Sequence, residues 1–224
     1  MFKSVVWSST IDYPDQVATV LFVGNCNWNC EYCHNVNLKD SKPIDFESDI
    51  LPRLLNRKDF INHAVISGGE CTCYKSLPQI IDTLVDNGFT IGIHTNGTNP
   101  KMLRNIIGNI SFVGMDIKCS DYKKYFNLND MELNNIKESV KLILNSGIEY
   151  EFRTTLFPKY FENKYDVLEI VEILKKLGAK KYILQEYVND FNPSLPDPWK
   201  KDFILDITKE CNKVLNTELK GHIE

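Results

Sequence analysis

Six short apolar segments rich in β-branched residues alternate with helix-patterned segments along most of this 224-residue chain. Such alternation predicts βα units and a parallel sheet. The predicted strands are residues 17–23, 63–67, 90–94, 112–118, 149–155 and 181–186. The predicted helices are residues 46–57, 77–87, 101–107, 132–146, 165–177 and 199–215. Six βα units fit an α/β fold of the open, partial (β/α)6 barrel type, and a flavodoxin-like open sheet is the alternative that the pattern leaves open.

Composition and charge predict a single soluble domain that spans residues 1–224. Hydrophobic residues make up 43% of the chain and charged residues 25%, as in a globular protein with a full core. The net charge of −4 gives no basic surface for nucleic acid, so no nucleic-acid partner is expected. No apolar run is long enough to span a membrane, and the first ten residues lack the apolar core of a signal peptide. A cytoplasmic location without membrane contact is therefore expected.

Three cysteines with a distinctive spacing directly follow the first predicted strand. Cys26, Cys30 and Cys33 form a C-x3-C-x2-C pattern, which can bind three irons of a [4Fe–4S] cluster and leave the fourth iron open. A structural zinc site needs four ligands, and Cys33 and His34 are adjacent in one tight loop, where both side chains rarely reach one metal. A disulfide framework does not fit the absence of an export signal. The spacing thus predicts an iron–sulfur cluster with an open coordination position.

Other polar motifs also follow predicted strands. Gly68-Gly69-Glu70 follows the second strand, Thr95-Asn96 the third, and Asp116-x-Lys118 ends the fourth. In parallel α/β barrels the functional residues gather at the carboxyl ends of the strands. The cysteine loop and these motifs are therefore expected to share one rim of the barrel. Paired glycines alone are common in turns, so the second motif gains its meaning from the first.

Taken together, these motifs resemble the radical SAM superfamily, in which S-adenosylmethionine (SAM) chelates the open iron. The segments Ser9–Pro14 and Cys33–Asn35 are further similar to the glycyl-radical-enzyme activases, most of all to those of anaerobic ribonucleotide reductases, and the similarity covers most of the chain. The resemblance implies a [4Fe–4S] cluster, reductive cleavage of SAM to a 5′-deoxyadenosyl radical, and hydrogen abstraction from a glycine of a partner enzyme. It also implies an electron donor of the flavodoxin or ferredoxin type and an anaerobic setting.

The same resemblance implies roles for single residues. Glu70 would accept hydrogen bonds from the SAM ammonium group, and Tyr32 would lie against the adenine, unless it only packs beneath the loop. Asp12 and His34 would face the glycine-bearing loop of the partner. The expected SAM-binding residues are Tyr32, Gly68, Gly69, Glu70, Thr95, Asn96, Asp116, Lys118, Arg153 and Gln185, and the expected metal ligands are Cys26, Cys30 and Cys33.

The chain also departs from the activase pattern. His94 stands where an acidic residue is usual before Thr95, so the carboxylate that could hold a monovalent cation beside SAM is missing there. Gln185 stands where a histidine is usual, and Asp15 where a glycine is usual. Four further cysteines are expected to be ordinary thiols rather than ligands of a second cluster, namely Cys71, Cys73, Cys119 and Cys211.

Two other functions compete with the activase. One is a radical SAM enzyme for a small molecule or a peptide, for instance one that resembles the deazapurine synthases. The other is a non-catalytic iron–sulfur or zinc scaffold, against which the intact set of SAM motifs argues. The short chain favours the activase, because a large partner would be needed to close the open side of the barrel.

Overall fold

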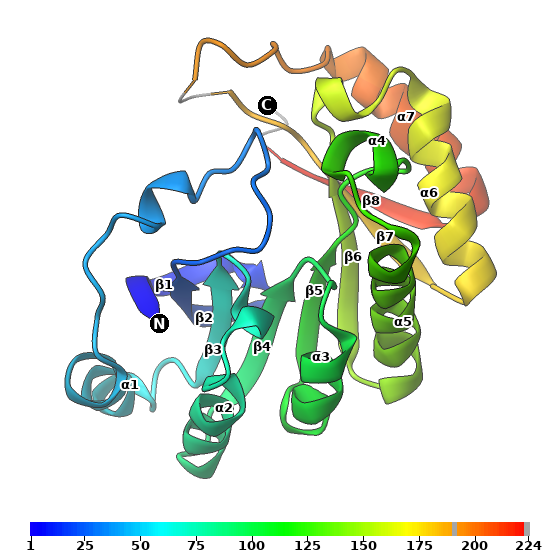
Figure 1. Ribbon diagram of the computed structural model, residues 1–224. Helices are drawn as coiled ribbons and strands as arrows, with labels where there is room; N and C mark the ends of the chain where they lie inside the picture. The colour runs from blue at the N-terminus through cyan, green and yellow to red at the C-terminus, as the bar shows by residue number, and fades with distance from the viewer. Residues whose placement is uncertain (190–191, 222–224) are drawn as a thin grey trace.

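The computed structural model describes residues 1–189 and 192–221, which form an eight-stranded sheet with helices along its outer face (Figure 1). Strands β2 to β8 are parallel, and β1 pairs antiparallel with β2. The first and last strands do not pair with each other, so the barrel stays open. In sheet order the strands are β1 (Phe2–Tyr13), β2 (Gln16–Val23), β3 (His63–Gly68), β4 (Thr90–Thr95), β5 (Phe112–Asp116), β6 (Glu149–Thr155), β7 (Lys181–Gln185) and β8 (Asn216–Lys220).

Helices connect the parallel strands and pack on one side of the sheet. Two of them begin with a capping box, in which Asn129 pairs with Glu132 and Asn163 pairs with Asp166. Among the described residues, no helix is long and apolar enough to cross a membrane. The helices are α1 (Leu51–Arg57), α2 (Leu77–Asp86), α3 (Pro100–Ile106), α4 (Tyr122–Phe126), α5 (Asp130–Ser146), α6 (Lys164–Leu177) and α7 (Lys201–Val214), and a π-helical turn (Phe46–Ile50) precedes α1.

The predicted order of six βα units is confirmed. The strands follow one another across the sheet in the order of the sequence, without the reversal that a flavodoxin-like sheet contains. The open partial barrel is therefore correct, and the flavodoxin-like alternative is wrong. Gly88, Gly147 and Gly178 follow their helices with positive φ angles of 79°, 77° and 99°, the left-handed conformation that glycine commonly adopts at a helix C-terminus.

Some elements differ from the prediction. Strand β1 was not predicted, although its side chains alternate between more and less buried positions along much of its length, and β8 is a short, polar strand with little apolar signal. The fourth predicted strand ends at Asp116 and not at Lys118, so the lysine lies in the loop after β5. Helix α4 was also not predicted.

The two faces of the sheet carry different side chains. The outer face packs against the helices in the main hydrophobic core. The inner face holds a small, separate apolar cluster near the amino ends of the strands. We call it the floor cluster, and it consists of Tyr13, Ala18, Val20, Val65 and Phe112. The inner face therefore has an apolar base below the carboxyl ends of the strands, where the chemistry is expected.

Candidate functional site

A cavity of about 210 Å³ opens at the carboxyl ends of the strands. The cysteine loop after β2 and the ends of β3 to β6 contribute side chains to it. It therefore lies where the sequence motifs were expected to meet. The lining residues are Cys26, Trp28, Cys30, Tyr32, Cys33, His34, Asn35, Ser67, Gly68, Gly69, Glu70, His94, Thr95, Asn96, Asp116, Lys118, Arg153 and Thr155.

The backbone after β3 holds the cysteine loop in place. The Gly69 amide donates to the Val23 carbonyl over 2.8 Å, and the Glu70 amide donates to the Asn25 carbonyl over 2.8 Å. A Cβ atom on Gly69 would lie 2.1 Å from the Asn25 oxygen, so only glycine allows this approach. The second motif thus fixes the start of the first.

All three cysteines of the motif line the cavity as free thiols. Burial raises the pKa of the Cys30 thiol to about 11, against the opposing effect of the nearby Lys118 ammonium. Within the described part of the chain, no three His, Cys, Asp or Glu side chains gather closely enough for a single metal ion. A [4Fe–4S] cluster instead binds each thiolate to a different iron, so three spaced thiols on one loop fit it.

The Glu70 carboxylate is buried and joins two loops. Its Oε1 accepts hydrogen bonds from the Thr72 amide and hydroxyl and from the Thr95 hydroxyl, and its Oε2 accepts one from the Asn96 amide. Burial raises the pKa of Glu70, while these hydrogen bonds act to lower it. Three of these four hydrogen bonds go to Oε1 and only one to Oε2, so Oε2 can accept a further hydrogen bond from a ligand.

The loop after β4 is tied directly to the cysteine loop. The Asn96 side-chain amide donates to Asn27 Oδ1 over 2.9 Å, and the Asn27 amide donates to the Thr98 hydroxyl over 2.9 Å. The Thr98 hydroxyl in turn donates to Asn96 Oδ1 over 2.7 Å. These three side chains close a hydrogen-bonded ring, which leaves Asn96 little freedom to rotate.

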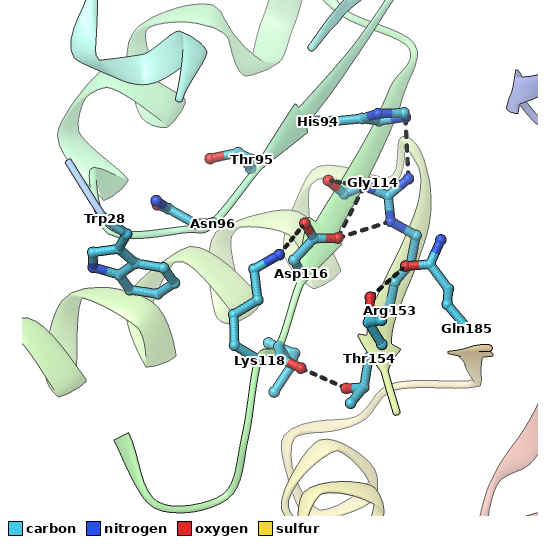
Figure 2. Close-up of polar contacts among 12 residues, drawn as sticks. Trp28, His94, Thr95, Asn96, Gly114, Asp116, Lys118, Arg153, Thr154 and Gln185 are labelled. Atoms are coloured by element: carbon cyan, nitrogen blue, oxygen red, sulfur yellow. Dashed lines mark hydrogen bonds and ion pairs between the residues drawn. The ribbon is translucent and has the colours of Figure 1, made fainter. Parts of the chain in front are cut away.

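Two cations flank one carboxylate at the ends of β5 and β6 (Figure 2). Lys118 Nζ lies 2.8 Å from Asp116 Oδ2, and Arg153 Nε and Nη2 each lie 3.0 Å from Asp116 Oδ1. Burial acts to raise the pKa of Asp116, but the Lys118 ammonium and the Arg153 guanidinium outweigh it and hold this pKa well below its usual range. The three groups carry a net charge of +1, which suits an anionic group of a ligand.

His94, on β4, contacts the Arg153 guanidinium from β6. Its Nε2 is 3.1 Å from Arg153 Nη1 and 3.0 Å from the Asp12 carbonyl oxygen, and its Nδ1 is 3.1 Å from the Ser67 hydroxyl. Burial, and then the positive charge of Arg153, lower the pKa of His94 to about 3. The imidazole is therefore neutral at physiological pH. We call Glu70, His94, Asp116, Lys118 and Arg153 the polar rim.

Tyr32 lines the cavity and also packs in an aromatic group. Its ring centroid lies 4.8 Å from that of Phe157 and 5.6 Å from that of Tyr160, and Lys118 Nζ lies 5.6 Å from the Tyr32 centroid. The buried Tyr32 hydroxyl has no hydrogen-bond partner among the described residues. Packing beneath the loop is thus observed, and the contact with adenine stays a prediction.

The structure gathers most of the predicted site residues at one place. All of them line the cavity except Asp12 and Gln185. The Asp12 carboxylate lies 3.9 Å from His94 Nδ1 and accepts a hydrogen bond from the Ser9 hydroxyl, and Gln185 Oε1 accepts a 3.4 Å hydrogen bond from the Thr155 hydroxyl. Asp12 and His34 are therefore not placed together on the cavity wall. The lining residues that were not predicted are Trp28, Asn35, Ser67, His94 and Thr155.

Simple signals in the sequence point to some of these missed residues. Ser67 directly precedes the glycine pair, and Asn35 closes the cysteine loop. Thr155 follows Arg153 by two residues, so it faces the same side of β6. His94 stood out only as a departure from the expected acidic residue, and its contact with Arg153 joins strands that are not neighbours in the sheet.

Residues 20–171 match the model of the radical SAM superfamily. The chain is 31% identical to a Methanocaldococcus jannaschii protein named as a candidate glycyl-radical enzyme activating enzyme, over 84% of this chain and 80% of that protein. It is 25% identical to the pyruvate formate-lyase-activating enzyme of Clostridium pasteurianum, over 96% of this chain and 94% of that enzyme. The structure resembles TYW1 with a lysine–pyruvate adduct bound, with a TM-score of 0.65 and 21% identity over 88% of this chain and 74% of the other.

Proposed function

This chain belongs to the radical SAM superfamily, and we propose that it activates a glycyl-radical enzyme by abstracting hydrogen from one glycine. Members of this family use a [4Fe–4S] cluster and SAM. The observation that carries the proposal is the match to two proteins named for this activity over 80% and 94% of their lengths. The cavity supports it, because the cysteine motif and all the polar rim residues line the same space.

Cys26, Cys30 and Cys33 would hold the cluster, because each can give one thiolate to a separate iron. When bound, the [4Fe–4S] cluster would supply the one electron that cleaves SAM into methionine and a 5′-deoxyadenosyl radical; this radical would take one hydrogen atom from the substrate, which gives 5′-deoxyadenosine and a substrate radical. The chain itself binds and orients the reactants and keeps water away.

The polar rim matches the ionic groups of a methionine moiety. Lys118 and Arg153 outnumber Asp116 by one charge, which favours a carboxylate, and the remaining lone pair of Glu70 Oε2 favours an ammonium group. Asn96 is held by its ring of hydrogen bonds and can present a fixed polar group to the ribose. These positions support the SAM contacts that the motifs predict.

The partner that we propose is an anaerobic ribonucleotide reductase, with an electron donor of the flavodoxin or ferredoxin type. His34 lies exposed on the cavity wall and can contact an incoming peptide. A peptide that enters the cavity needs partners for its backbone N–H and C=O groups, since unpaired buried amides are costly. His34 is our candidate for that role inside the cavity, and Asp12, which does not line the cavity, is our candidate for a contact with the partner's loop outside it.

The test combines the reduced, cluster-loaded protein with SAM and an anaerobic ribonucleotide reductase under anaerobic conditions. The expected result is the EPR doublet of a glycyl radical, with 5′-deoxyadenosine formed in equal amount. The Cys26→Ala variant is the control and should give neither product. Stoichiometric 5′-deoxyadenosine with a small metabolite or a peptide, and no doublet with any glycyl-radical enzyme, would replace the activase with the small-molecule or peptide enzyme.

A further inference from the structure

Arg153 is held on three sides in the cavity (Figure 2). Its Nε and Nη2 bind Asp116 Oδ1, its Nη2 lies 3.5 Å from the Gly114 carbonyl oxygen, and its Nη1 faces His94 Nε2 at 3.1 Å. The side chain is only 10% exposed. These contacts fix the orientation of the guanidinium. A change in any one of the contacting groups should therefore move its positive charge.

The hydrogen-bonding state of His94 follows from its neighbours. Arg153 can only donate a hydrogen bond and the Asp12 carbonyl can only accept one, yet both lie close to the same Nε2 atom. A neutral imidazole can satisfy one of them. A hydrogen bond from a charged donor is about twice as strong as a neutral one, which favours an unprotonated Nε2 that accepts from Arg153. In that tautomer Nδ1 carries the proton and donates to the Ser67 hydroxyl.

Gly114 makes the room for this contact. A Cβ atom at position 114 would lie 2.7 Å from Arg153 Nη1 and 2.8 Å from His94 Cδ2. Both atoms belong to side chains that are held by other bonds, so neither can move aside without losing a partner. The φ angle of Gly114 is not positive, so side-chain space and not backbone conformation selects glycine here.

We propose that His94 and Gly114 are positioning residues, which place the Arg153 guanidinium on Asp116 so that its charge faces the cavity. His94 does this as a hydrogen-bond acceptor through Nε2, and Gly114 by leaving the space open. The inference rests on the proposed function only where Arg153 is taken to contact SAM. The placement of Arg153 itself is a property of the cluster-free chain and can be tested there.

The first measurement uses the wild-type, cluster-free protein. Long-range ¹H–¹⁵N NMR of His94, assigned with the His94→Gln variant, reports which ring nitrogen carries the proton. The proposal requires a protonated Nδ1 and an unprotonated Nε2. A protonated Nε2 would mean that His94 donates to Asp12 and does not hold Arg153, and would overturn the proposal whatever the protein's activity.

The second measurement uses two matched variants. Glutamine can place an acceptor near the position of Nε2, whereas asparagine reaches only the position of Nδ1. The Arg153 Nε–H signal, assigned with Arg153→Lys, should stay sharp in His94→Gln and be broadened by solvent exchange in His94→Asn and Gly114→Ala. Circular dichroism checks that the variants fold. An unchanged Arg153 signal in His94→Asn and Gly114→Ala would refute the positioning role.

The third measurement links the placement to SAM. Calorimetric titration of the cluster-loaded proteins with SAM should show binding in His94→Gln within about threefold of wild type and binding at least tenfold weaker in His94→Asn, because one charge-assisted hydrogen bond corresponds to about that factor. Equal affinity in both variants, with Arg153 displaced in His94→Asn by NMR, would show that Arg153 does not contact SAM and would refute that part alone.

Discussion

The floor cluster and the polar rim occupy the same inner face of the sheet but have opposite character. On β5 the inward residues change from Phe112 through Gly114 to Asp116. The floor cluster is fully or nearly fully buried and apolar, and its burial stabilises the fold. The rim instead places charged groups in a poorly solvated cavity, which costs free energy unless they are paired.

This difference suggests that the floor cluster stabilises the fold, whereas the polar rim serves the chemistry. Apolar side chains could fill the rim of the barrel as they fill its floor. Replacing a whole buried ion pair by apolar side chains is often neutral or stabilising. The pairing of Asp116 with Lys118 and Arg153 is therefore best explained by a ligand with ionic groups. Variants in the floor cluster and in the polar rim can therefore test whether stability and chemistry divide between the two regions.

The largest expected effect concerns the cysteines. Alanine at Cys26, Cys30 or Cys33 should abolish cluster assembly, because an iron without its thiolate is lost. Cys73→Ala and Cys211→Ala are the controls and should keep the full iron content. The measurement is iron and sulfide per chain after anaerobic reconstitution. Iron loss in Cys73→Ala, or about eight irons per chain in the wild type, would show that a second cysteine set takes part.

Glu70 tests whether a rim residue can also be structural. Glu70→Gln replaces an acceptor oxygen by an NH₂ group that faces N–H or O–H donors, which should lower the free energy of unfolding by roughly 2 kcal/mol. Thr72→Val, which removes one donor to Glu70, should cost less. Urea denaturation of the cluster-free proteins measures both. Equal stability of Glu70→Gln and wild type would show that these hydrogen bonds add nothing.

A further effect, which shows only as a change with pH, is the pH dependence of stability from His94, whose folded-state pKa is about 3 against an ordinary value near 6.5. Below pH 6.5 the unfolded chain binds a proton that the folded chain does not, so stability falls as the pH falls toward 3. The slope approaches about 1.4 kcal/mol per pH unit. The groups that face His94 are Asp12 from β1, Ser67 from β3, Asp116 from β5, Arg153 from β6 and Lys220 from β8.

His94→Gln removes this titration and keeps an acceptor. The difference in unfolding free energy between wild type and His94→Gln should therefore be constant above pH 7 and change steadily between pH 6 and pH 4.5. Asp116 also has a lowered pKa, but it titrates below this window and is present in both proteins. A difference that does not change with pH would mean that His94 is protonated in the folded protein as readily as in the unfolded chain.

The sequence alone predicted the βα order because each parallel strand is a compact apolar run with a turn after it. It also predicted where the cysteines and Glu70 meet, because the carboxyl ends of parallel strands share one edge. Strand β8 was missed because its five residues are mostly polar and show no strand pattern; its pairing with β7 holds it in the sheet. Strand β1 was missed because its apolar residues do not alternate along the sequence and because its antiparallel pairing lies outside the βα repeat.

The internal contacts of the site were harder to predict. The hydrogen bonds from Thr95 and Asn96 to Glu70 and the contact of His94 with Arg153 join loops and strands far apart in the sequence. No local spacing encodes such contacts, since they depend on strand register and on the space left by Gly114. Asp12 is expected to face the partner's glycine-bearing loop, and the unpredicted strand β1 brings its backbone carbonyl next to His94.

A rim variant and a floor variant together test most directly whether the floor cluster stabilises the fold and the polar rim serves the chemistry. Lys118→Met removes a rim charge and leaves Asp116 bound to Arg153, and Val65→Ala removes two methyl groups from the floor cluster. Val65→Ala should lower the free energy of unfolding by about 2 kcal/mol, from the lost burial and the cavity left behind. Lys118→Met should lower that free energy by less, about 1 kcal/mol, because Asp116 loses one cationic partner but keeps Arg153, and the methionine carries no charge that must be desolvated.

The deciding measurement is the rate of 5′-deoxyadenosine formation from SAM by the cluster-loaded, reduced variants, determined beside their unfolding free energies. Lys118→Met should form 5′-deoxyadenosine at a rate about 10- to 100-fold below wild type, the loss expected for one charge-assisted hydrogen bond. Val65→Ala should cleave SAM at the wild-type rate while it stays folded. Wild-type SAM cleavage by Lys118→Met, or its loss in folded Val65→Ala, would contradict the division between a floor that stabilises and a rim that reacts.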